Sequence, residues 1–441
     1  MSNCTKSNPI LGDFNPVLNI FDSNINTFAM YHDVFDLAPK SKKYKIKPLP
    51  TTVKVFEANL SFTGDSCPVC GTVHPKIYVK DTKKSYIKMP SVSGMITYLL
   101  LNKTRYKCLS CNKTFTPQSS LTNYGCFISN KIKDQIAIKL AETLTIKYIA
   151  REHNVSSNTV IRELDRYDIT ANHKTFKNYL PEVLHFDEFK STKDALGNMS
   201  FVMLDGGKRE ILDIVENRQL SYLLKYFSYY TKQAKDNVKF IIIDIYVPYM
   251  QLIKEIFPNV KLILDRFHIV QNLTRAFNKT RIKIMNTSEV LYSKIKSHWK
   301  ILLQAKNKLS YKRYKNRSFN YQWLSNKERV DYLLSNNKEL DRNYQVYQDV
   351  LMAFQYRDKE KFIKAINQDL TGVSDSIKSC LKTFRKYLPE ILNSLEVPYN
   401  NGVLEGKISK IKKLKSISCG FRKFSRMKTR IMMIEKLIKV Y

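Results

Sequence analysis

The segment KFIIIDIYVPYMQLIKEIFPNVKLILDRFHIV, residues 239–270, decides the fold of this 441-residue chain. Its two ends, residues 239–246 and 261–270, are apolar runs with the length and Ile-rich composition of buried strands. Between them, residues 249–257 place their apolar side chains at helical spacing. A strand, a helix and a second strand in this order are typical of an α/β sheet.

The residues before this segment extend the same sheet. VLHFDEFK, residues 183–190, predicts a strand, and residues 201–216 predict a hairpin with its turn at Asp-Gly-Gly. Residues 221–230 have helical spacing, and the chain from 274 to 395 is helical by pattern, with weak turn signals. The order of these elements predicts a mixed α/β domain followed by a long helical region.

Aspartates interrupt the apolar strands of this domain. Asp187 lies inside VLHFDEF, and Asp244 ends the run 240–243. A buried carboxylate needs a compensating cation, and two carboxylates on neighbouring strands can hold a divalent metal ion. Asp265, at the end of LILD, competes with Asp244 for the second place, whereas turn chemistry alone explains Asp205. Spacing leaves the third ligand open.

Four of the eight cysteines form two C-x-x-C pairs. The pairs are Cys67-Pro-Val-Cys70 and Cys108-Leu-Ser-Cys111, each flanked by short alternating strands. Four thiolates close a tetrahedral zinc site, whereas the alternative is a redox couple or buried thiols. Because four cysteines fill the ligand shell, we discount His74 and expect a structural zinc ribbon without a catalytic role.

A helix-turn-helix pattern follows the cysteine pairs. TIKYIAREHNVSSNTVIRELDRY, residues 145–167, predicts one helix, a turn near Asn154, and a second helix that Ser156 or Ser157 caps. In such a motif the second helix enters the major groove of DNA. Its exposed face would consist of Asn158, Thr159 and Arg162. The alternative is an ordinary pair of packed helices without a ligand.

The charge of the chain indicates a polyanionic partner. Lys and Arg outnumber Asp and Glu by 74 to 39, a formal net charge of +35. Nucleic acid fits this excess best, because an anionic membrane would need an amphipathic or lipidated anchor. The N-terminus lacks a signal-peptide pattern, and no apolar stretch approaches the roughly 18 residues of a membrane span. We therefore expect a cytoplasmic protein without a membrane partner.

Taken together, these residues resemble the DDE transposases of bacterial insertion sequences, specifically the ISL-three family. The likeness runs from about residue 67 to the C-terminus. The motifs that carry it are R-Y-K-C-L-S-C-N-K-T-F, H-F-D-E-F, I-I-I-D, L-D-R-F-H-I-V-Q, N-N-G-V-L-E-G, K-I-K-K-L-K and C-G-F-R. The D-R-F-H block and the late N-G-x-x-E-G are the most specific of them.

The resemblance implies an RNase H-like catalytic domain with acids at Asp187, Asp244 and Glu405, the last on a helix after the sheet. These acids would hold Mg²⁺ or Mn²⁺, and Asp265 and His268 would support them. The implied enzyme binds the ends of its own element, cuts them, and joins the freed 3′-hydroxyls to target DNA. Double-stranded DNA would be its partner, in a homodimer or larger synaptic complex within the nucleoid.

Composition and pattern, together with the resemblance, give an order of domains. We expect an N-terminal arm (1–52), a zinc ribbon (53–120), a helix-turn-helix (127–170), a first part of the core (181–272), a helical insertion (273–397) and a C-terminal part of the core (398–441). Residues 400–441 contain twelve Lys or Arg and two Glu, and look like a pair of basic helices. Their candidate contacts with the DNA backbone are Lys410, Lys412, Lys413, Arg422 and Arg426.

The chain departs from the family pattern next to the last acid. Lys407, Ile408 and Ser409 follow E-G where we expect an Asn, and Tyr399-Asn400 stands in place of Ser-Asn. All three acids are present, so an active transposase is the first hypothesis. The alternative is a catalytically inactive, transposase-derived regulator that binds specific DNA sequences.

Overall fold

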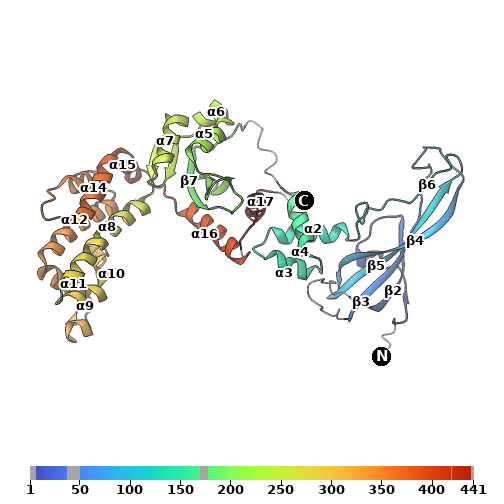
Figure 1. The fold of residues 1–441 in the computed structure, drawn as a ribbon, viewed down its shortest axis with the longest axis horizontal. Helices are drawn as coiled ribbons and strands as arrows, with labels where there is room; N and C mark the ends of the chain where they lie inside the picture. The colour runs from blue at the N-terminus through green and yellow to red at the C-terminus, as the bar shows by residue number, and fades with distance from the viewer. Residues whose placement is uncertain (1–5, 37–49, 169–176, 419, 439–441) are drawn as a thin grey trace. The chain divides into compact units, whose positions relative to one another are not determined.

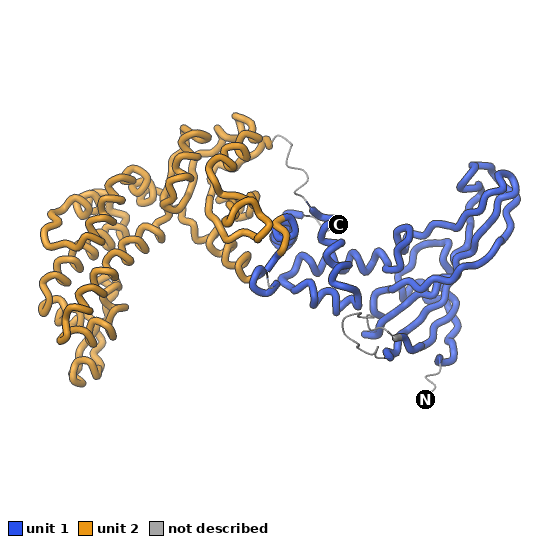
Figure 2. The backbone as a smooth tube through the Cα atoms, viewed as in Figure 1, with its two compact units in different colours: residues 1–171, 414–421, 425–441 blue, residues 172–413, 422–424 orange. Residues whose placement is uncertain are grey.

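The computed structural model describes residues 6–36, 50–168, 177–418 and 420–438. The chain divides into two units, coloured separately in Figure 2. Unit 1 contains residues 1–171, 414–421 and 425–441, and unit 2 contains residues 172–413 and 422–424. Unit 1 is therefore built from segments that lie far apart in the sequence.

Unit 1 contains a six-stranded sheet with the order β1-β2-β3-β5-β4, and β6 pairs with β5. Its strands are β1 (Ile10–Leu11), β2 (Ile25–Asp36), β3 (Pro50–Leu60), β4 (Ile77–Val92), β5 (Met95–Cys108) and β6 (Thr114–Phe115). The helix α1 (Asn15–Leu18) lies between β1 and β2.

The sequence predicts an arm for residues 1–52, and this prediction is wrong for the described part, because β2 lies inside the sheet. Ile25, Thr27, Ala29 and Tyr31 are buried at every second position, the spacing of a strand with one face in a core.

Unit 1 also contains a group of four helices: α2 (Asn130–Leu140), α3 (Ile146–Glu152), α4 (Ser157–Arg166) and α17 (Phe424–Ile434). Ser156 is the N-cap of α4, and Asn154 in the preceding turn has a φ of 53°. Ile149, Val160 and Met433 belong to one buried cluster, so α17 completes the core of the three earlier helices. The predicted helix, turn and helix at residues 145–167 is confirmed as local structure.

Unit 2 contains the five-stranded sheet β11-β10-β7-β8-β9. Its strands are β7 (Val183–Lys190), β8 (Met199–Asp205), β9 (Glu210–Val215), β10 (Phe240–Ile243) and β11 (Lys261–Leu264). Strands β7, β10 and β11 are parallel neighbours, whereas β7, β8 and β9 pair antiparallel. The helices α5 (Leu220–Ser228), α6 (Lys232–Asp236) and α7 (Val247–Ile256) connect the strands.

The predicted strand at residues 261–270 ends early. The chain leaves β11 at Leu264 and enters the long helix α8 (Arg266–Thr287). Ile269, Leu273 and Phe277 are buried along one side of α8, at helical spacing. The prediction is wrong beyond Leu264, because most of this helical spacing lies after residue 270 and the apolar residues before it continue the run of β11.

The remaining helices of unit 2 are α9 (Tyr292–Ser297), α10 (Trp299–Leu302), α11 (Asn326–Ser335), α12 (Lys338–Tyr356), α13 (Lys359–Asn367), α14 (Asp375–Lys386), α15 (Leu388–Glu396) and α16 (Gly402–Ile417) (Figure 1). A small hairpin of β12 (Tyr314–Lys315) and β13 (Trp323–Leu324) interrupts them. Within the described residues, no helix has the length and apolar character needed to span a membrane.

Candidate active site and cysteine cluster

Three aspartates of unit 2 lie level with one another, Asp187 within β7 and Asp244 and Asp265 directly after β10 and β11. Ile242 of β10 pairs with His185 of β7, and Asp244 and Asp187 each lie two positions further along. The parallel register of β10 and β11 likewise brings Asp265 level with Asp244. Equivalent ends of parallel strands meet at one edge of a sheet, so the three carboxylates gather there.

The electrostatics of this edge favour a bound cation. Burial raises the pKa of Asp187 to about 7, and the charge of Asp244 adds to the rise. The pKa of Asp244 is also raised to about 7, first by burial and then by the charges of Asp265, Glu188 and Glu405. Among the described residues, no hydrogen-bond partner reaches Oδ1 of Asp244 or Oδ2 of Asp265, although both atoms are buried. Such oxygens are ready ligands for a hard divalent ion.

His268, in the first turn of α8, connects the acids. Its Nε2 lies 3.1 Å from Oδ2 of Asp244 and 3.7 Å from Oε1 of Glu405. One ligand atom each from Asp244, Asp265 and His268 lie within 4.8 Å of one another. Within the described part of the chain, Asp187 and Glu405 are not members of that group. The structure therefore gathers the two predicted supporting residues with Asp244 in one group of possible metal ligands.

Asn401 fixes the start of the helix that carries Glu405. Its Oδ1 lies 3.0 Å from Nδ1 of His185, and its backbone N–H donates to Oδ1 of Asp265 at 3.2 Å. Glu405 lies one turn later and donates its own N–H to the carbonyl of Asn401 at 2.9 Å. Asn401 is fully buried. The sequence prediction missed it, although an Asn-Gly pair one turn before a helical acid was the available signal.

Replacing Asn401 with Ala is expected to lower the free energy of unfolding of unit 2 by about 1–3 kcal/mol, because the ring of His185 then keeps a buried nitrogen without its partner. Urea unfolding followed by circular dichroism measures this change. The neighbouring Asn400 is exposed, so Asn400→Ala is the matched control and should have the smaller effect. Equal effects of the two substitutions would contradict the role given to Asn401.

The four cysteines of the two C-x-x-C pairs gather in unit 1. Their sulfur atoms lie within 4.8 Å of one another. The two pairs fold alike, since Cys67 N–H donates to the Thr72 carbonyl and Cys108 N–H donates to the Lys113 carbonyl, each at 3.0 Å. Residue 71 after the first pair and residue 112 after the second have positive φ values, 74° and 57°. This four-thiolate cluster is consistent with a structural zinc ion.

The residues predicted to face DNA lie on two parts of the chain. Asn158 and Arg162 are exposed on α4, whereas Thr159 is half-buried and bonds Ser156 at the helix cap. Four predicted basic contacts are exposed, namely Lys410, Lys412, Lys413 and Arg422. Arg426 has another partner, because its Nε and Nη2 each lie 2.7 Å from a carboxylate oxygen of Asp165.

Comparisons with known proteins found two matching family models and one curated relative. Residues 184–431 match the ISL3 model of DDE transposases, described as a transposase. Residues 64–111 match a family described as the zinc-finger of transposase IS204/IS1001/IS1096/IS1165. A Lactococcus lactis subsp. lactis protein named ATP-dependent protease is 40% identical over 103 residues, which are 23% of this chain and 33% of that protein. The alignment thus spans about a third of that curated relative. The first of these matches covers more than half of the chain and includes all the acids of the candidate site.

Proposed function

The chain belongs to the ISL3 (ISL-three) family of DDE transposases, and on that premise we propose that Asp187, Asp244 and Glu405 are its catalytic acids. Asp265 and His268 act beside them. The enzyme binds the ends of a bacterial insertion sequence, cuts DNA strands there and transfers them to a target. The observation that carries this proposal is the row of carboxylates at one edge of the sheet, which His268 links to Glu405.

The catalytic domain has an RNase H-like fold in this proposal. The antiparallel strands β9, β8 and β7, continued by the parallel strands β10 and β11, support it. The core then consists of residues 181–272 and 398 onwards, with residues 273–397 as a helical insertion. Residues 53–120 form the ribbon domain with help from β2, and residues 127–170 form the helix-turn-helix with help from α17.

Mg²⁺ or Mn²⁺ would be held by Asp187, Asp244 and Glu405, with Asp265 as a further ligand. When bound, such ions activate the attacking water or hydroxyl and stabilise the leaving oxygen. His268 holds the carboxylates of Asp244 and Glu405 near each other, and Asn401 sets the start of α16. In unit 1, zinc on Cys67, Cys70, Cys108 and Cys111 stabilises the ribbon.

A transposase binds DNA, and the contacts proposed here follow charge and exposure. On α4 they are Asn158 and Arg162, with Thr159 mainly serving the helix cap. On the C-terminal segment they are Lys410, Lys412, Lys413 and Arg422. Arg426 is removed from this set, because Asp165 engages its guanidinium. Synapsis of two element ends favours a homodimer or larger assembly in the active complex.

Replacing Arg162 with Ala is expected to weaken binding to the element ends about tenfold, since a base contact from arginine contributes roughly 1–3 kcal/mol. Fluorescence anisotropy with labelled end DNA measures the affinity. Arg166 lies on the same helix but pairs with Glu163 at 2.7 Å, so Arg166→Ala is the matched control. Equal losses in both variants would indicate only general attraction to phosphate.

The deciding experiment is cleavage and strand transfer of labelled element-end DNA by the full chain in Mg²⁺ or Mn²⁺. Cut ends with free 3′-hydroxyls and joined products support the transposase reaction. Cleavage without joining would instead indicate a nuclease. A protein that binds the ends tightly but never cuts them would favour the second candidate, the inactive regulator. The residues after Gly406, which differ from the family pattern, favour this candidate.

A further inference from the structure

One part of the helical insertion is strongly basic and rich in aromatic residues. Residues 290–327 contain ten Lys or Arg and no Asp or Glu. Both tryptophans of the chain, Trp299 and Trp323, also lie in this segment. We call residues 290–327 the aromatic-basic segment. The uniform positive charge of the segment fits a polyanionic ligand, and its aromatic side chains indicate a ligand that has more than phosphate groups to contact.

Phe319 of this segment is buried, whereas four larger aromatic side chains face solvent. Tyr311 is 73% exposed, Tyr321 62%, Trp323 61% and Trp299 42%. Burying such rings normally stabilises a fold, so several exposed rings on one short segment indicate a binding surface.

A lysine lies against three of these rings. Lys300 is 5.6 Å from the ring centre of Trp299, Lys315 is 5.6 Å from that of Trp323, and Lys327 is 5.5 Å from that of Tyr311. Rings paired with cations are the combination that binds bases and backbone of a nucleic acid together.

The backbone of the small hairpin is strained at Tyr321, whose ring it exposes to solvent. Between β12 and β13, Asn320 and Tyr321 have φ values of 51° and 58°. Asn adopts this left-handed conformation readily, whereas an aromatic residue rarely does. The ring of Tyr321 gains no burial in return, because it is exposed. Strain without a packing benefit is typical of residues kept for contact with a ligand.

Trp299 also borders an open hollow of about 550 Å³. The hollow is also lined by Asn278, Arg281 and Asn286 of α8 and by Lys296 of α9. Arg281 is buried and donates to Oδ1 of Asn278 and to the carbonyl of Ile295, so the exposed amide of Asn286 and the ammonium of Lys296 offer the donors and acceptors that the edge of a nucleobase requires. A ring beside such groups can stack on a base while they bond its edge.

We propose that the aromatic-basic segment binds single-stranded DNA, with unpaired bases stacked on Trp299, Tyr321 and Trp323 and the phosphates near the lysines. The inference rests on the proposed function, which supplies DNA as the substrate. Intact duplex is the weaker occupant, because its bases are already stacked on each other and offer no free face.

The two tryptophans make the test direct, because together they account for all tryptophan emission of the chain. The zinc-loaded full chain is titrated with oligo(dT) of about 20 nucleotides, with duplex of equal length and with oligo(U). We expect oligo(dT) to quench the emission more strongly than duplex. Trp299→Phe and Trp323→Phe assign the quenching to the remaining tryptophan in each case.

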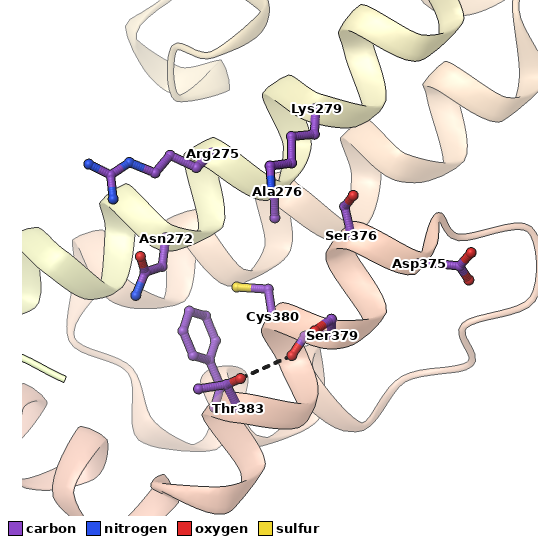
Figure 3. A pocket seen from close by; sticks show the side chains of 10 residues that line it. Asn272, Arg275, Ala276, Lys279, Asp375, Ser376, Ser379, Cys380 and Thr383 are labelled. Carbon is purple, nitrogen blue, oxygen red and sulfur yellow. Dashed lines mark hydrogen bonds between the residues drawn. The ribbon is translucent and has the colours of Figure 1, made fainter. Parts of the chain in front are cut away.

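Affinity provides the second readout. The double variant Trp299→Ala/Trp323→Ala should bind oligo(dT) about tenfold to a hundredfold more weakly, with little change for duplex. The matched control is Arg275→Ala on α8, which removes a cation from a different hollow that faces α14 (Figure 3). That variant should weaken the binding of oligo(dT) and of duplex to the same extent, and oligo(dT) should still quench the tryptophan emission.

Equal quenching by duplex and oligo(dT), or a preference for oligo(U), would overturn the inference, as would the absence of quenching by any of them. Comparing the cleavage of DNA by the wild type and by Asp244→Asn tests the proposed function separately from this inference. A protein that never cuts DNA but shows the oligo(dT) response leaves the inference standing. A protein that cuts and joins DNA without the response rejects the inference alone.

Discussion

Replacing Asp244 with Asn is expected to lower metal-dependent cleavage of element-end DNA about a thousandfold, a change of roughly 4 kcal/mol in the activation free energy. The amide keeps the shape of the side chain but removes the charge that a divalent ion needs. Asp187→Asn and Glu405→Gln should act alike, because each acid is proposed to hold the same ions. Single-turnover cleavage at saturating protein measures the loss.

A second readout of these variants does not depend on cleavage. Burial and three neighbouring acids raise the pKa of Asp244, which means that its negative charge is disfavoured without a cation. Bound Mg²⁺ or Mn²⁺ should therefore stabilise unit 2. The melting temperature of the wild type is expected to rise with metal, and that of Asp244→Asn to rise less. Asp349 is exposed on α12, and Asp349→Asn is the matched control. Unchanged cleavage in the three acid variants would reject the assignment of the site.

Removal of zinc is expected to have the second large effect, the unfolding of the ribbon. Binding of zinc by four thiolates is worth on the order of 10 kcal/mol in small zinc domains. Cys67 and Cys108 are buried, so loss of the ion leaves their sulfurs packed together without a charge partner. Chelation, or Cys108→Ser, should make the segment between β3 and α2 sensitive to protease and weaken binding to element ends.

Limited proteolysis with mass spectrometry, together with the zinc content per chain, measures this effect. Cys126 lies in the same unit, is half-buried and is outside the four-cysteine cluster, so Cys126→Ser is the matched control. The control should retain one zinc ion per chain. A ribbon that stays resistant to protease after complete loss of zinc would contradict the structural role of the metal.

Much of the sheet in unit 2 could be predicted because its signals are local. The strand around Asp187, the Asp-Gly-Gly turn and the helix before Phe257 each occupy a few consecutive residues with one clear period. In the turn, Oδ1 of Asp205 accepts the N–H groups of Gly207 and Lys208, which confirms the explanation of this residue by turn chemistry. The cluster of the two cysteine pairs could be predicted equally well, because the C-x-x-C spacing is typical of metal-binding thiolates.

The features that could not be predicted depend on contacts between distant segments. The side chain of Asn401 meets His185 across more than two hundred residues, and no local pattern announces such a pair. The level arrangement of Asp244 and Asp265 follows from strand register, which composition does not encode. The role of Glu405 could not be predicted from its local sequence either, because an acid within a basic segment is usually an ion-pair partner. Family resemblance supplied it instead.

The packing of α17 has a consequence for the synthesis of the protein. Met433 packs into the core of α2, α3 and α4, and Arg430 donates to the carbonyls of Glu142 and Leu144 in the connection between α2 and α3. A ribosome adding about 5–20 residues per second needs roughly ten to fifty seconds to travel from α4 to α17. Throughout that interval the apolar residues of the nascent helices that pack against Met433 lack this partner. The proposed helix-turn-helix therefore gains α17 only after the catalytic residues have been made, so an interrupted translation product lacks this part of its core.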